Sequence, residues 1–526
     1  MFRKLLPLAF LRAVAATVTV TTPLGDVHGK LDDQGKVSSF KGIPFAKAPV
    51  GALRFADPEP WTHGYGPGGL DATAFRSKCA CSAQEGSEDC LFLNIYTPSA
   101  QPSAAESRPV LFFIHGGAFI LGSSSDYDGT VLAAKHGAVV VTVNYRLGSF
   151  GWLQLIKGSA NFGLKDQREA MRFVQRETNG VKFISAFGGD SSRLMIFGES
   201  AGGISVADHL VAPKSFGLFT SALFESGMPS ASGQDLALEK GANFSRAAGC
   251  GAAQDALACL RVKTTKELKT AEAILSPPWS NPFTTMLWGP TVDATDIPDV
   301  PLKLVIAGKH AHVPIAAGSN SDEGAAFVKP YYPVMTAGVY KQFVHEFLSN
   351  GRPFNETVYE AALKFYPPGW WRNQETAGSL IADATFICGA KAVVAHFQDS
   401  FLYHFNYGKG PVLHGAELNY IFENGRLGSG GEALAETVGA FWTSLAATGR
   451  PGTEKQWPAY KNATDLDLVI DSRMSVESGR RLKYCNFWLG AFSQGFTLPD
   501  PMRILGSRLT RLPADVDPPA SSVVHV

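Results

Sequence analysis

One five-residue segment carries the strongest chemical signal in this sequence. Gly198 to Gly202 reads Gly-Glu-Ser-Ala-Gly, follows an apolar run and precedes a helical pattern over Ile204–Val211. In this context a serine occupies a strained turn between a strand and a helix, where glycines avoid crowding of the backbone. Such a turn holds the hydroxyl clear of the sheet. The sequence therefore predicts Ser200 as a nucleophile.

A second segment, His-Gly-Gly at 115–117, ends an earlier apolar run. Glycines at this place leave backbone amide groups open to a substrate oxygen. We expect the N–H groups of Gly116 and Gly117, together with that of Ala201, to stabilise the negative charge that develops when an acyl carbonyl is attacked. Loss of one such donor typically lowers turnover by ~10²–10³-fold.

A serine nucleophile requires a histidine base, which a carboxylate orients. The chain order on folds with this turn is serine, acid, histidine. His414 follows a late apolar run on a loop, whereas His404 lies inside that run and is expected to be structural. The acid should follow the run Val313–Ala317, where the residue types alone do not distinguish Asp322 from Glu323.

The elements that must position these residues follow a strand–helix alternation. Apolar runs at Val110–Ile114, Val139–Val143 and Leu194–Phe197 end at turn residues, and 167–176 has helical spacing. This pattern predicts an α/β fold with a mostly parallel sheet, and ligands bind beyond the carboxyl ends of its strands. We expect 329–386 to be a helical insertion over the active site, within one catalytic domain over 17–526.

Composition narrows the partners. The 526 residues include 47 Lys plus Arg and 47 Asp plus Glu, so there is no basic surface for nucleic acid, and a small-molecule substrate is expected. The basic and apolar start resembles a signal peptide over 1–16, and no other run predicts a transmembrane anchor. Glycosylation sequons at Asn243, Asn355 and Asn462 favour secretion to the extracellular space.

Seven cysteines allow disulfides in an oxidising compartment. Cys250 and Cys259 could close a small loop, and Cys90 could pair with Cys79 or Cys81. The odd count leaves at least one thiol unpaired within a monomer.

Many segments resemble the type-B carboxylesterase/lipase family, whose members include cholinesterases, fungal lipases and catalytically silent adhesion proteins. The resemblance is to a fungal-type secreted carboxylesterase. The matching segments are 40–46, 53–55, 87–94, 115–117, 144–146, 187–190, 198–203, 289–293, 322–324 and 414–415.

The resemblance implies the α/β-hydrolase fold and hydrolysis of carboxylic esters by Ser200, with His414 as base and Glu323 as acid. It implies Gly116, Gly117 and Ala201 as oxyanion donors, and no metal or organic cofactor. It also implies a bridge between Cys250 and Cys259, and one from Cys90 to Cys79 or Cys81, with Cys81 as the expected partner. Glu199 has at most a supporting role.

Three departures from the family pattern bear on function. The segment 81–90 is short and contains no tryptophan, which disfavours both a choline site and a long lipase lid. The segment 178–183 is longer than the family pattern.

Lipase, thioesterase or other acyl hydrolase activity and a silent adhesion protein are the alternatives to a carboxylesterase function. Trp288, Phe327, Trp370 and Phe386 are candidates for pocket walls, each with ordinary core packing as the alternative.

Overall fold

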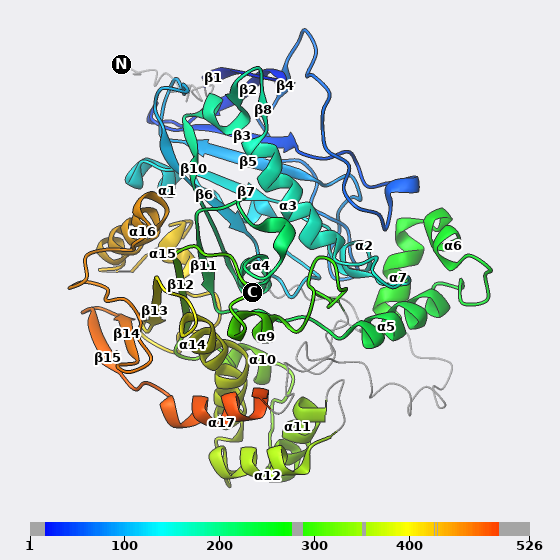
Figure 1. Ribbon diagram of the computed structural model, residues 1–526, viewed down its shortest axis with the longest axis vertical. Coiled ribbons are helices and arrows are strands. Elements are labelled where there is room, and N and C mark those ends of the chain that lie inside the picture. Colours follow the sequence, from blue (N-terminus) through cyan, green and yellow to red (C-terminus); the bar gives the residue numbers. More distant parts are fainter. Residues whose placement is uncertain (1–15, 276–287, 350–353, 426, 429, 494–526) are drawn as a thin grey trace, which may run out of the picture.

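The computed structural model describes residues 16–275, 288–349, 354–425, 427–428 and 430–493, so the expected signal peptide lies outside the described residues except for its last position. A large twisted sheet runs through the protein, with helices on both faces (Figure 1). Its strands are β1 Thr17–Thr22, β2 Gly25–Leu31, β3 Ser38–Pro44, β4 Leu70–Asp71, β5 Phe92–Thr97, β6 Arg108–Ile114, β7 Val139–Val143, β10 Gly189–Glu199, β11 Ser221–Glu225, β12 Ile315–Asn320, β13 Ser400–Phe405, β14 Leu466–Ile470 and β15 Ser475–Ser478.

The centre of this sheet is parallel. Strands β7, β6, β10, β11, β12, β13 and β14 are neighbours in that order, and each adjacent pair is parallel. Among the described strands of this sheet, the antiparallel pairs lie toward the two edges, at β1–β2–β3–β5–β7 and at β14–β15. The expected mostly parallel sheet is confirmed. Because parallel strands end at the same edge, the segments after β6, β10, β12 and β13 are brought together.

The central strands are apolar on both faces because each face packs against helices. In β6, Phe112 belongs to the core under α3 (Phe162–Gln175) and α4 (Ala201–His209), whereas Leu111 and Phe113 belong to the core under α1 (Thr130–His136) and α16 (Gly431–Thr448). All three side chains are fully buried. Burial of such a side chain contributes about 1.5–3 kcal/mol to the free energy of folding. Because successive side chains of a strand point to opposite faces, this gain fixes which face each residue of β6 occupies.

The helices of the described chain are assigned as follows. They are α1 Thr130–His136, α2 Gly148–Trp152, α3 Phe162–Gln175, α4 Ala201–His209, α5 Gln234–Ala247, α6 Ala256–Val262, α7 Thr265–Leu275, α9 Pro301–Ile306, α10 Ala325–Val328, α11 Ala337–Ser349, α12 Glu356–Phe365, α13 Asn373–Ile381, α14 Cys388–Val394, α15 Leu418–Ile421, α16 Gly431–Thr448 and α17 Leu482–Ser493. A π-helical turn, Ala382–Ile387, joins α13 to α14.

The segment expected to be a helical insertion forms α11, α12 and α13, which cluster with α17 at one end of the molecule (Figure 1). These helices have a hydrophobic core of their own, centred on residues such as Tyr340, Phe347 and Trp488. The helical stretch Asn373–Val394 is long and apolar enough to cross a membrane, but 94% of its most apolar window is buried inside the protein. Its composition is explained by this packing.

Three disulfides stabilise the fold, and one differs from the expected pairing. Cys250 pairs with Cys259 as predicted, whereas Cys90 pairs with Cys79 and not with Cys81. The third bridge joins Cys388 to Cys485.

The prediction for Cys81 was wrong because the hairpin that follows Cys79 directs the Cys81 side chain elsewhere. The backbone of Cys79 forms a β-bridge with Ser87, and that of Cys81 forms one with Gln84. The buried Cys81 thiol donates a hydrogen bond to Ile120 O.

The long segment after α3 is a regular β-hairpin. Its strands are β8 Glu177–Thr178 and β9 Val181–Lys182, and they pair in antiparallel fashion. Asn179 and Gly180 connect them, both with positive φ, which is the preferred composition of a two-residue hairpin turn. The extra residues therefore form a local, self-contained structure.

Candidate active site

Ser200 occupies the tight turn between β10 and α4. Its backbone has φ 58° and ψ −122°, a conformation that costs energy for any residue other than glycine. A Cβ at Gly198 or Gly202 would overlap with Ile114 O on the neighbouring strand. The Ser200 N–H donates to Glu225 O at 2.9 Å, which fixes the turn to β11. The glycines of the motif thus permit the close approach that raises Ser200 above the sheet.

The three expected oxyanion donors lie around Ser200. A Cβ at Gly116 would be 3.1 Å from Ser200 Cβ, so the Gly116 backbone is directly beside the nucleophile. Ala201 is the first residue of α4, so its N–H lies in the first turn, at the positive end of the helix dipole. Among the described residues, the N–H groups of Gly116, Gly117 and Ala201 donate to no other protein group. They are therefore available to a substrate oxygen.

A buried histidine holds the peptide group that carries the Gly117 N–H. His115 Nδ1 lies 2.8 Å from Gly116 O, and Tyr145 stacks on the imidazole with its hydroxyl donating to His115 O at 2.8 Å. Burial lowers the pKa of His115 to about 4, so the ring is neutral at pH 7 and donates from Nδ1 to the carbonyl. That carbonyl shares a peptide plane with the Gly117 N–H. His115 and Tyr145 were missed as supporting residues, although both end apolar strands.

The predicted base and acid are in direct contact. His414 Nδ1 lies 2.6 Å from Glu323 Oε2, and Glu323 is fully buried. The other oxygen of Glu323 accepts from Ser226 Oγ at 2.5 Å and from Asn320 N at 2.6 Å. Asp322, the alternative acid, is exposed. The structure therefore places Glu323, and not Asp322, behind the imidazole.

Glu199 lies on the other side of the same imidazole. Its Oε1 is 3.1 Å from His414 Nε2, an ion-pair distance, but among the described residues neither atom makes a hydrogen bond. Burial alone lowers the pKa of His414, yet the carboxylates of Glu199 and Glu323 outweigh it and raise the pKa to about 9. Burial also raises the pKa of Glu199, to about 7. Glu199 thus influences the charge of the base directly.

Two further carboxyl groups, which sequence reasoning missed, lie beneath the site. Glu225 accepts from Trp442 Nε1 at 2.6 Å, and Glu417 accepts from the Asn320 amide. Burial raises the pKa of Glu417 to about 8, with the carboxylates of Glu199 and Glu323 adding to the shift, and burial also raises the pKa of Glu225. Glu225 ends β11, so the rule that sites form at strand ends could have found it.

The four aromatic residues proposed as pocket walls separate into two groups. Phe327 and Phe386 both face His414, with ring centroids 5.0 and 4.8 Å away. Trp288 is buried against Phe244, and Trp370 is 97% exposed. Phe327 and Phe386 are therefore the aromatic neighbours of the base.

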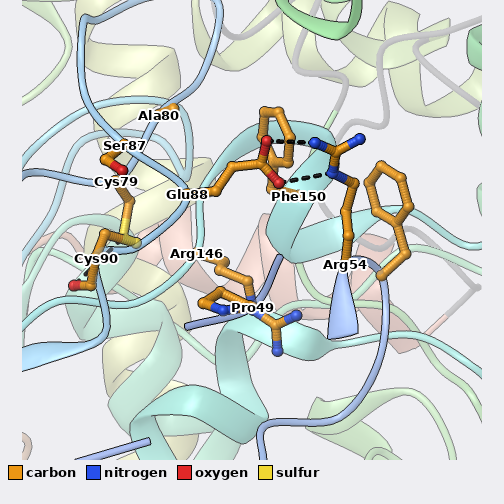
Figure 2. Close-up of a pocket in the computed structure, with 10 residues that line it drawn as sticks. Pro49, Arg54, Cys79, Ala80, Ser87, Glu88, Cys90, Arg146 and Phe150 are labelled. Atoms are coloured by element: carbon orange, nitrogen blue, oxygen red, sulfur yellow. Dashed lines mark hydrogen bonds and ion pairs between the residues drawn. A yellow bond between two sulfur atoms is a disulfide. The ribbon is translucent and has the colours of Figure 1, made fainter. Parts of the chain in front are cut away.

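A buried ion pair with a structural role lies beside the Cys79–Cys90 disulfide. Figure 2 shows Arg54 reaching Glu88 through two hydrogen bonds, each 2.6 Å, in a small pocket beside the disulfide. Arg54 also donates to three carbonyl oxygens near the end of α6. This pocket contains none of the predicted catalytic residues. The described residues also contain no cluster of side chains suited to a metal ion.

Comparison with known proteins agrees with this geometry. A model described as "Carboxylesterase family" matches residues 16–488. Para-nitrobenzyl esterase of Bacillus subtilis is 33% identical over 497 residues, which cover 87% of this chain and 96% of that protein. Cholinesterase of Mus musculus is 30% identical over 530 residues, which cover 89% and 86%.

Solved structures show the same likeness. A PNB esterase matches with a TM-score of 0.77 at 32% identity, covering 90% of this chain and 100% of its own. A thermophilic PNB esterase matches with the same TM-score, identity and coverage. The family match, the relatives and the shared α/β-hydrolase architecture have one consequence: the chain belongs to the carboxylesterase family and is a serine hydrolase of carboxylic esters.

Proposed function

We propose that this enzyme hydrolyses carboxylic esters through an acyl-enzyme formed on Ser200, with His414 as the base and Glu323 as the acid. Ser200 Oγ attacks the ester carbonyl carbon while its proton passes to His414 Nε2. The C–O bond to the alcohol then breaks, and His414 returns the proton to the departing alkoxide. Glu323 stabilises the imidazolium that exists between these two transfers.

The second half of the reaction repeats the first with water as the nucleophile. His414 removes a proton from water, which attacks the acyl carbon and releases the carboxylic acid, and Ser200 recovers its proton. In both halves the carbonyl oxygen becomes negatively charged. The free N–H groups of Gly116, Gly117 and Ala201 are the donors that stabilise this charge.

One observation carries the proposal above all. The buried Glu323 contacts His414 at 2.6 Å, and the other ring nitrogen of His414 lies 3.1 Å from Glu199, the residue before Ser200 in its strained turn. A buried carboxylate that holds an imidazole in one orientation is the arrangement that general-base catalysis requires. It is also costly to maintain for stability alone, because burial of charge is unfavourable.

The test replaces the nucleophile. Ser200→Ala should abolish turnover of a simple aryl ester and leave the urea unfolding midpoint close to that of the parent protein. An organophosphonate probe should add one adduct to the parent protein, located on Ser200 by peptide mass mapping, and none to the variant. Retained turnover in purified Ser200→Ala would refute the assignment.

A silent adhesion protein is the rival from a different class. Such a protein on this fold usually has a substituted nucleophile or base, whereas Ser200 and His414 are both present here. Failure of the probe to label the folded parent protein would favour that rival. Thioesterase or amidase activity is distinguished by measuring ester, thioester and amide derivatives of one acyl group side by side.

The preferred substrate in this proposal is an uncharged ester. The loop between Cys79 and Cys90 contains no tryptophan to bind a quaternary ammonium group. One relative is named for para-nitrobenzyl esters. We expect para-nitrobenzyl and short-chain aryl esters to be hydrolysed at a higher kcat/KM than the matching choline esters, and an ester panel of varied acyl length tests this.

Secretion and glycosylation form part of the same proposal. Three disulfides in the described chain support folding in an oxidising compartment. Among the three sequons, Asn355 and Asn462 are exposed, while Asn243 on α5 is half-buried. We expect sugar at Asn355 and Asn462 before Asn243. Glycosidase treatment followed by peptide mass mapping of the secreted protein tests this order.

A further inference from the structure

The segment that follows the oxyanion donors is strained. Ala118 and Phe119 have φ of 51° and 62°, two consecutive non-glycine residues in the left-handed region. Each such residue costs about 1–3 kcal/mol, and it persists only where surrounding contacts hold it. Residues 118–122 therefore need an external support if the preceding Gly116 and Gly117 are to keep their orientation.

Gly122 transmits the position of this segment to the donors. Its φ is 99°, and a Cβ at this position would lie 2.6 Å from Gly116 O and 2.7 Å from His115 Nδ1. The backbone of Gly122 thus packs directly on the Gly116–Gly117 peptide, whose N–H is a predicted donor. Movement of Gly122 would displace that peptide, because interiors packed this closely transmit strain.

The side chain of Gln84 supports Gly122 from a different part of the chain. Gln84 Oε1 accepts from Gly122 N at 2.9 Å, and Gln84 Nε2 donates to Gly122 O at 3.1 Å. The same Nε2 also donates to Cys79 O at 2.9 Å. Both backbone groups of Gly122 are therefore bound by one amide, which supplies a donor and an acceptor from the same side chain.

The loop that carries Gln84 is itself well anchored. The Cys79–Cys90 disulfide closes it, and Ala80 N donates to Ser87 O at 3.0 Å within it. The Cys81 thiol donates to Ile120 O, two residues before Gly122. Burial, aided by the charge of Glu272, raises the pKa of this thiol to about 12, so it remains protonated and able to donate.

We propose that Gln84 is a positioning residue for the oxyanion hole, acting through Gly122 on the Gly116–Gly117 peptide. The inference rests on the proposed function, because it assigns these N–H groups to the transition state. Donors of this kind act mainly after the carbonyl is attacked, so their displacement lowers kcat more than it raises KM. Complete loss of one donor costs ~10²–10³-fold, and we expect partial displacement to cost on the order of tenfold.

The first experiment compares Gln84→Ala with Glu85→Ala. Glu85 is the adjacent residue, its side chain is 98% exposed, and it serves as the matched control. With an aryl ester, Gln84→Ala should lower kcat by on the order of tenfold with KM changed less than about twofold, whereas Glu85→Ala should change neither. Unchanged kcat in Gln84→Ala, or an increase in KM alone, would overturn the proposal.

The second experiment uses Gln84→Glu to separate positioning from loss of structure. An ionised carboxylate accepts from Gly122 N but cannot donate to Gly122 O, whereas the protonated form can do both. The ratio of kcat in the variant to kcat in the parent should therefore rise as the pH falls toward 5. Charges near the loop, Glu85, Glu272 and Lys269, are common to both proteins and cancel in this ratio.

A ratio that stays constant with pH would contradict the proposal. This outcome differs from failure of the proposed function. If the proposed function were wrong, Ser200→Ala would remain active and the phosphonate probe would not label Ser200. If Gln84 alone is misassigned, Ser200 stays essential while both Gln84 variants keep the parent kcat.

Discussion

Glu199 Oε1 lies 3.1 Å from His414 Nε2, on the side of the imidazole opposite Glu323. The proposed base is therefore held between two carboxyl groups, one of which, Glu199, is the last residue of β10 and directly precedes the nucleophile. The charge on Glu199 favours the imidazolium form, whereas catalysis by general base requires the neutral form. This opposition makes the pH dependence of the enzyme informative.

Replacement of Glu199 by Gln should move the acid limb of the pH profile to lower pH. The neutral form of His414 is active, so kcat/KM appears as the pH rises through the His414 pKa, which Glu199 helps to raise to about 9. Removing the Glu199 charge lowers the His414 pKa and extends activity to lower pH. We would measure kcat/KM for an aryl ester from pH 5 to 10. The exposed variant Glu85→Gln is the control, and an acid limb that stays in place in Glu199→Gln would contradict the assignment.

Glu417→Gln should make stability less dependent on pH. Burial, with the charges of Glu199 and Glu323, raises the Glu417 pKa from 4.5 to about 8. Between these values the folded protein holds a proton that the unfolded chain releases, so stability falls as the pH rises through this window. Each such proton contributes at most about 1.4 kcal/mol per pH unit.

The measurement is urea unfolding at several pH values between 5 and 8. The free energy of unfolding of the parent protein should decrease over this interval, and that of Glu417→Gln should decrease less. The amide retains an acceptor for Asn320, so loss of the hydrogen bond does not obscure the comparison. Parallel curves for the two proteins would show that Glu417 is already ionised in the folded state.

The parts of the site that could be predicted from the sequence are those that local geometry determines. Ser200 and Gly116 follow apolar strands, and adjacent parallel strands end at one edge, so their proximity follows from chain order. The choice between Asp322 and Glu323 needed either the family resemblance or the structure, because two successive carboxyl residues on a turn differ only in the direction of their side chains.

The features that could not be predicted depend on contacts between distant segments. The pairing of Cys90 with Cys79 depends on a hairpin register that spacing does not encode. Glu417 is buried because α15 and β12 enclose it, and Gln84 reaches Gly122 only because the two loops lie side by side. Each of these relationships joins residues 11 to 97 positions apart, whereas sequence patterns report mainly on neighbours within a few turns.

Removal of the Cys388–Cys485 bridge should destabilise the protein far more than removal of the Cys81 thiol. The bridge closes a segment of 97 residues between α14 and α17, and loop entropy predicts a contribution of up to about 4–5 kcal/mol. Cys81→Ser keeps a donor for Ile120 O. The double variant Cys388→Ser/Cys485→Ser should lower the free energy of unfolding by about 2–4 kcal/mol, and Cys81→Ser by less than about 1.5.

Peptide mapping without reduction is the accompanying measurement. It should identify Cys79–Cys90, Cys250–Cys259 and Cys388–Cys485, with Cys81 alkylated only after unfolding. A peptide that joins Cys81 to Cys90 would contradict the structure of the loop and, with it, the support that this loop gives to the oxyanion segment.

Gly202→Ala should disrupt the turn that presents Ser200. A Cβ at position 202 would overlap with Ile114 O on β6 and lie 2.9 Å from His115 O, so the strand and helix must separate. This separation should lower the free energy of unfolding by about 1–3 kcal/mol or more. Because the same backbone carries Ala201, one of the proposed donors, the soluble variant should also lose most aryl ester turnover and phosphonate labelling. Both are measured beside urea unfolding.

Gly338→Ala is the matched control for this substitution. Gly338 lies in the first turn of α11, where the nearest atom to an added Cβ is Thr336 Oγ1 at 3.9 Å. A helical glycine with open space around it gains about 0.4–1 kcal/mol on replacement by alanine, because the unfolded chain loses freedom. Opposite effects on stability from the same chemical change would locate the requirement for glycine in the packing of β6 against the turn. If Gly202→Ala were as active and stable as Gly338→Ala, the close approach of Gly202 to Ile114 would not be essential to the position of Ser200.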